Sequence, residues 1–180
     1  MGEIEEALKA NFCADLPRYL PEAAGYASIR EAPVGNYYGI TKNIDLLLIE
    51  RTSASSGIDE WSRSIGIPFA KAKREKAGII GSLPPQTKVW VVEAERSRES
   101  LWEGIGQAFG YRALVMMDNG GLWVAGGAVI VPDYEERDEL IESAVQAIRT
   151  GLQIDLRIIR VSIPASLRQQ NADSGQAKLA

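Results

Sequence analysis

Two apolar runs of strand length constrain the fold more than any other feature of this sequence. NIDLLLIER spans residues 43–51, and KVWVVEAER spans residues 88–96. A run that is apolar at consecutive rather than alternate positions is typical of a strand covered on both faces. Since helices on either side of a sheet provide such cover, the two runs predict an α/β domain.

Helical and extended segments alternate along the rest of the chain. Apolar residues at helical spacing predict helices over residues 3–13, 97–111 and 133–151. Further strands are expected over residues 26–34, 113–118 and 156–163, with 122–131 either a strand or a buried connection. Asp133 and Glu136 have the spacing of a capping box for the last helix. Strands joined by a short turn are expected to be antiparallel and those joined through helices parallel, which predicts a central mixed sheet flanked by helices.

The length of 180 residues favours a single domain. We expect this domain to cover residues 1–165, with an insertion at 52–87 and a polar tail at 166–180. The N-terminus is acidic, unlike the basic start of a secretory signal, and no apolar stretch approaches the ~20 residues of a membrane span. The sequence therefore predicts a cytoplasmic protein without a membrane segment.

Composition excludes several kinds of chemistry. The chain contains no histidine, which removes Ser-His-Asp and Cys-His catalysis and histidine-ligated zinc or haem. Any general base must be a carboxylate, a lysine, a tyrosine or a metal-bound hydroxide. The net charge of −4 provides no global positive field, so binding of nucleic acid would require a local basic patch.

Three acids lie in the two apolar runs. Asp45 lies inside the first run, and Glu93 and Glu95 near the end of the second project from the same face of their strand. Carboxylates are rarely buried unless they are paired or bind a metal ion, and Mg²⁺ prefers oxygen ligands of this kind. The alternative is that each acid lies in water at a strand end, paired with Arg51 or Arg96.

The order of these acids and the helix that follows them resembles a known pattern. The matching positions are Asp45, Glu93, Glu95 and, within WEGIGQAFGYRAL at 102–114, Gln107 and Tyr111. An acid in one core strand, a second strand ending in acid-x-acid or acid-x-lysine, and a helix with a GQxxxY-like run resemble the PD-(D/E)XK nuclease superfamily. The resemblance covers residues 3–118 and implies a restriction-endonuclease-like fold.

The resemblance also implies a function and a set of site residues. The expected activity is metal-dependent endonuclease hydrolysis of DNA phosphodiester bonds. Asp45 and Glu93 would bind Mg²⁺ or Mn²⁺, and Glu95 would bind metal or activate water. Gln107 and Tyr111, which share one helix face, would contact the phosphate or hold the site by hydrogen bonds.

Two further expectations come from the same resemblance. The first helix brings an additional glutamate to the metal in parts of this superfamily, and Glu5 is the first candidate for it, with Glu6 the second. A homodimer is expected, because a small domain that cuts duplex DNA must address two strands.

The sequence departs from the family pattern at two positions. No proline precedes Asp45, where Asn43 and Ile44 stand, and Glu95 replaces the usual lysine. Some members of the superfamily cleave with a glutamate at that position, so the change does not exclude activity, although it removes the residue that usually orients the water and stabilises charge. The alternative is a catalytically inactive module that binds nucleic acid or protein, and a third reading is another α/β hydrolase or transferase that uses the same acids.

A cluster of basic residues lies in the expected insertion. Its members are Lys71, Lys73, Arg74 and Lys76. Side chains of this kind can bind the phosphate backbone of nucleic acid without reading its sequence. The alternative is a solvated helix face, since Glu75 lies among them.

Overall fold

A five-stranded mixed sheet forms the centre of the structure, a computed structural model that describes residues 2–35, 42–51 and 78–168. The strands are β1 (Ala27–Val34), β2 (Lys42–Ile49), β3 (Lys88–Ala94), β4 (Trp123–Pro132) and β5 (Leu156–Val161). They lie in the order β1-β2-β3-β4-β5. β2 pairs antiparallel with β1 and β3, whereas β4 pairs parallel with β3 and β5. The predicted mixed sheet and the antiparallel first pair are therefore confirmed.

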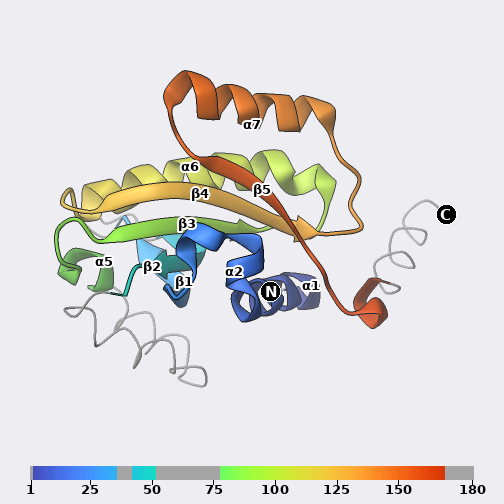
Figure 1. Ribbon diagram of the computed structural model, residues 1–180, viewed down its shortest axis with the longest axis horizontal. Coiled ribbons are helices and arrows are strands. Elements are labelled where there is room, and N and C mark those ends of the chain that lie inside the picture. Colours follow the sequence, from blue (N-terminus) through green and yellow to red (C-terminus); the bar gives the residue numbers. More distant parts are fainter. Residues whose placement is uncertain (1, 36–41, 52–77, 169–180) are drawn as a thin grey trace.

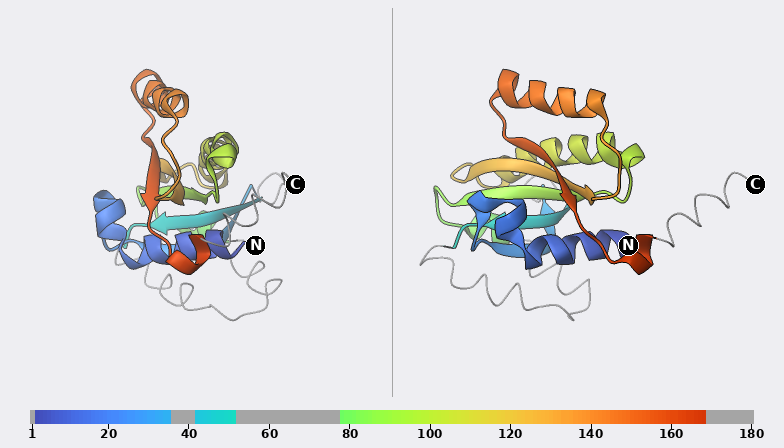
Figure 2. Two further views of the ribbon diagram at one scale, coloured as in Figure 1. Left: turned by 90° about the vertical axis from the view of Figure 1, so that its right-hand side faces the viewer. Right: turned by 45° about the vertical axis from the view of Figure 1, so that its right-hand side comes forward.

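Helices cover both faces of this sheet, as Figures 1 and 2 show. α1 (Glu3–Ala14) and α2 (Leu16–Tyr19) lie on one face, and α6 (Leu101–Asp118) and α7 (Glu139–Leu152) lie on the other. The short α5 (Ile79–Ser82) precedes β3, and 3₁₀ turns form at Pro21–Ala23 and Arg98–Ser100. None of the described helices is long and apolar enough to cross a membrane.

The continuous apolar run of β2 is buried from both sides, as the sequence predicts. Leu46 and Leu48 pack with Phe12 of α1 in one core cluster. Leu47, which points to the opposite face, packs in a second cluster with Val115 of α6. Since both faces are occupied, the second half of this strand, from Leu46 to Ile49, is fully buried.

The expected strand over residues 113–118 is wrong, because α6 continues through Asp118. Val115 lies seven residues after Ala108, and both are buried on the same face of the helix. Alanine, leucine and methionine in this segment are strong helix formers. The apolar run at residues 113–118 has the length of a strand, but its buried residue continues the helical spacing of α6, so the segment is the last part of that helix.

The last helix begins later than the capping box predicts. Asp138 caps α7, because its Oδ1 accepts hydrogen bonds from the backbone N–H groups of Leu140 and Ile141. Asp133 instead accepts a hydrogen bond from the Ser162 hydroxyl. Its carboxylate therefore joins the ends of β4 and β5 and is not available to a helix.

Candidate functional site

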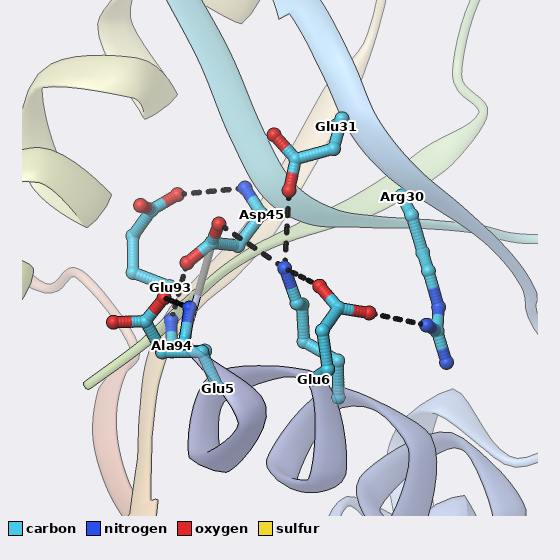
Figure 3. Close-up of polar contacts among 9 residues, drawn as sticks. Glu5, Glu6, Arg30, Glu31, Asp45, Glu93 and Ala94 are labelled. Carbon is cyan, nitrogen blue, oxygen red and sulfur yellow. Dashed lines mark hydrogen bonds and ion pairs between the residues drawn. The ribbon is translucent and has the colours of Figure 1, made fainter. Parts of the chain in front are cut away.

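The pairing of β2 with β3 ends at two acids, and the carboxylate of each accepts a hydrogen bond from the backbone of the other strand. Leu46 and Val92 are the last paired residues, and Asp45 and Glu93 are the first beyond them. The Asp45 Oδ2 atom accepts a hydrogen bond of 2.8 Å from the backbone N–H of Ala94, and the Asp45 N–H donates one of 3.3 Å to Glu93 Oε1 (Figure 3). Each carboxylate thus replaces a backbone partner where the strands separate.

The third acid of this row comes from β1. The β1–β2 pairing skips Glu31 and Asp45, which lie opposite each other between the pairs Arg30–Leu46 and Ala32–Ile44. Glu31 has a φ of 51°, in the left-handed region that favours glycine. Glu31, Asp45 and Glu93 therefore occupy corresponding positions on three neighbouring strands.

A buried lysine from α1 lies among these acids. Lys9 has no exposed surface, and its Nζ lies 2.8 Å from Glu6 Oε1, 3.0 Å from Glu31 Oε1 and 3.7 Å from Asp45 Oδ1. Burial lowers the pKa of Lys9, but the three carboxylates outweigh burial and raise it overall. The other Glu6 oxygen pairs with Arg30 at 2.9 Å, so Glu6 is committed to ion pairs and is not a metal-ligand candidate.

The acids border one polar pocket of about 480 Å³. It contains all six of the predicted site residues that the structure describes: Glu5, Asp45, Glu93, Glu95, Gln107 and Tyr111. The other lining residues are Gly2, Asn43, Ala94, Arg96, Ser100 and Glu103. The predicted nucleic-acid cluster of Lys71, Lys73, Arg74 and Lys76 lies outside the described residues.

Burial and mutual repulsion shift the titration of the pocket acids. Burial, followed by the negative charge of Asp45, raises the pKa of Glu93 to about 9, so Glu93 holds a proton at neutral pH when no cation is present. Burial also raises the pKa of Asp45 and of Glu95, although a hydrogen bond from Ala94 opposes the rise for Asp45 and one from Ser100 opposes it for Glu95. A ligand that brings positive charge would therefore relieve the repulsion among these acids and favour their ionised forms.

α6 forms the opposite wall of the pocket. Glu103, Gln107 and Tyr111 follow one another at four-residue spacing and so share one face of this helix. The Gln107 side-chain amide donates a hydrogen bond of 3.1 Å to Glu103. Burial and the nearby negative charges raise the pKa of Tyr111, which keeps its hydroxyl protonated and able to donate.

A glycine of α6 allows the helix to approach Glu95 closely. A Cβ atom on Gly104 would lie 2.7 Å from Glu95 Cγ and 2.9 Å from Val129 Cγ1. We expect Gly104→Ala to lower the free energy of unfolding by about 1–3 kcal/mol because of this overlap.

Gly106 provides the matched control in the same helix. A Cβ atom there would meet no described atom within 4 Å. Gly106→Ala is expected to raise the free energy of unfolding by about 1 kcal/mol through helix propensity. Urea denaturation of both variants measures the difference, and equal effects would contradict the close approach at Gly104.

The pocket acids offer carboxylate oxygens, the type of ligand that hard divalent cations prefer. Within residues 2–35, 42–51 and 78–168, no three acidic or cysteine side chains are arranged to hold a metal ion, so the expected cage that includes Glu5 is not preformed. Mg²⁺ usually takes only one or two protein carboxylates and keeps several waters. Asp45 and Glu93, adjacent and open to the pocket, meet that requirement.

Sequence reasoning missed two members of this site, Lys9 and Glu31. Lys9 lies three residues after Glu6 and between the buried Leu8 and Phe12, which is the available signal that it faces the sheet. For Glu31 no such signal exists, because a charged residue among the alternating polar and apolar residues of a strand is ordinarily exposed to solvent.

Comparison of the chain with protein-family models, curated proteins and solved structures finds no match.

Proposed function

We propose that this protein is a metal-dependent nuclease that hydrolyses phosphodiester bonds in DNA, with the restriction-endonuclease-like fold that its sequence resembles. The observation that carries the proposal is the contact between Asp45 and Glu93, a half-buried and a buried acid from neighbouring strands that line one pocket. Glu95, Gln107 and Tyr111 line the same pocket. The three parts of the sequence resemblance thus meet at one place in the fold.

Asp45 and Glu93 would hold Mg²⁺ or Mn²⁺ in this site. When bound, the ion supplies a nucleophilic water and stabilises the negative charge that develops on the phosphate. Glu95 lies two residues beyond Glu93 and is partly desolvated, which raises its pKa and suits it to take a proton from the attacking water. The Tyr111 hydroxyl donates to a phosphate oxygen, and Gln107 holds Glu103 in place.

Contacts to DNA are expected to come from basic side chains. Arg96 lines the pocket, and the basic cluster of Lys71, Lys73, Arg74 and Lys76, outside the described residues, belongs to the same proposal. Contacts of this kind neutralise phosphates and make binding depend on salt concentration. The homodimer also belongs to the proposal, since two copies of the site are needed to cut both strands of a duplex.

The alternative is a nuclease-like module that binds DNA or protein without cutting. Two observations favour it: Glu95 stands where a lysine is usual, and Lys9 already places a positive charge beside Asp45. A module of this kind would bind DNA with no requirement for a divalent cation.

Cleavage assays on plasmid and branched DNA separate the two functions. We expect the wild-type protein to cut with Mn²⁺ or Mg²⁺ and to lose all activity in EDTA, because Asp45 and Glu93 require a cation to engage phosphate. Fluorescence anisotropy with the same DNA measures binding independently. Binding without cleavage under every metal condition would contradict the nuclease proposal and support the binding module.

A further inference from the structure

Lys9 is an unusual residue for the interior of a protein. Lysine is almost never fully buried unless it is paired, because the charge loses its hydration. Lys9 is fully buried, and its ammonium group lies within 4 Å of three carboxylates. It is not among the residues that line the pocket, but it contacts Asp45, which is one of them.

The two oxygens of Asp45 are fixed by different groups. Oδ2 accepts the backbone N–H of Ala94, and Oδ1 faces the Lys9 ammonium group. Together these contacts define the orientation of the carboxylate plane. Among the described residues, removing Lys9 would leave the Asp45 carboxylate the Ala94 hydrogen bond, about which it can rotate.

Two of the acids that pair with Lys9, Glu6 on α1 and Glu31 on β1, are themselves fixed in place. Glu6 pairs with Lys9 through one carboxylate oxygen. Its other oxygen pairs with Arg30 (Figure 3), which links α1 to β1. Glu31 reaches Lys9 from a left-handed backbone conformation that costs a non-glycine residue about 1 kcal/mol or more. A lysine needed only for packing would not require an acid in a strained conformation opposite the site.

We propose that Lys9 is a positioning residue of this pocket, which fixes the orientation of the Asp45 carboxylate from behind the pocket wall. Its effect on cleavage rests on the proposed nuclease function, whereas its effect on Asp45 does not. A merely structural Lys9 would stabilise the fold without influencing the Ala94–Asp45 hydrogen bond.

The Ala94 amide proton is a direct reporter of Asp45 orientation. We expect Lys9→Met to accelerate hydrogen exchange at Ala94 by at least about tenfold relative to Val92, which pairs with Leu46 inside the ladder. Lys9→Arg, which keeps the charge, is expected to retain most of the protection. Lys88→Met is the matched control, since Lys88 pairs with Glu50 at the opposite end of β3.

Metal binding and kinetics provide the second readout. Loss of a group that orients a metal ligand typically weakens affinity or activity by about 10- to 100-fold. We expect Lys9→Met to weaken Mn²⁺ binding by that factor in calorimetry, and to lower kcat for plasmid cleavage with KM unchanged. Lys88→Met is expected to change neither.

The outcomes separate the two proposals. Unchanged Ala94 exchange and Mn²⁺ affinity in Lys9→Met would overturn the positioning role, even if the variant were less stable. A wild-type protein that cuts no DNA would overturn the nuclease function, while Ala94 exchange would still decide the role of Lys9. If Lys9→Met does not fold, Lys9→Met combined with Glu31→Gln removes one charge of each sign and permits the same exchange measurement.

Discussion

Replacing Asp45 with asparagine is expected to lower the rate of metal-dependent DNA cleavage by about a thousandfold. The substitution keeps the size of the side chain and an oxygen that can accept from the Ala94 N–H. It removes the negative charge that would hold the cation beside Glu93. Single-turnover cleavage of plasmid DNA at saturating Mn²⁺ measures the loss, and calorimetry of Mn²⁺ binding shows whether the ion is lost with it.

Asp155→Asn is the matched control for this experiment. Asp155 is also an acid in an ion pair, with Arg157, but it precedes β5 at the end of the sheet away from the pocket. Its replacement is expected to leave the cleavage rate within about twofold, since surface changes have small effects. Equal losses in both variants, or full activity in Asp45→Asn, would contradict the proposed site.

Replacing Glu93 with glutamine is expected to stabilise the metal-free protein, increasingly so as the pH rises. Glu93 is 3% exposed, and its pKa is raised from 4.5 in a free chain to about 9, mainly by burial. Between these values the folded protein binds a proton that the unfolded chain has lost. The free energy of unfolding of the wild type therefore falls with rising pH, by at most about 1.4 kcal/mol per pH unit from this group.

Glutamine has no such titration and can still accept the hydrogen bond from the Asp45 N–H. Urea unfolding in EDTA at pH 5, 7 and 9 measures the difference between the two proteins, which is expected to grow with pH to a few kcal/mol. Added Mn²⁺ should reduce the difference, because binding to the native wild type stabilises it. A difference that does not depend on pH would contradict the raised pKa of Glu93.

The sheet was more predictable from the sequence than the helix boundaries. A strand buried on both faces leaves a clear signature in β2 and β3, because consecutive apolar residues suit no exposed element. Ala113–Asp118 shows the limit of this signature, since a short apolar run fits the buried face of a helix equally well. Only the packing of Val115 against the sheet decides between them.

The site was predictable where its residues interrupt an apolar pattern. Asp45 and Glu93 are acids in otherwise buried strands, and the spacing of Gln107 and Tyr111 places both on one helix face. The helical spacing places Lys9 next to the buried Leu8 and Phe12, but this alone does not predict its burial, because a lysine in an amphipathic helix is normally solvated. Its burial depends on three acids brought from α1, β1 and β2, which only the tertiary fold brings together.

At position 31 the backbone conformation favours glycine, whereas the ion pair with Lys9 requires an acid. Glycine there would relieve the left-handed conformation, which costs other residues about 1 kcal/mol. The same change would remove an acid that pairs with Lys9. Removing one partner of a buried charge typically costs about 3–5 kcal/mol, which exceeds the strain that glycine would relieve. Heat resistance and a working pocket therefore both favour glutamate here, and the strained backbone is expected to persist in variants selected for either property.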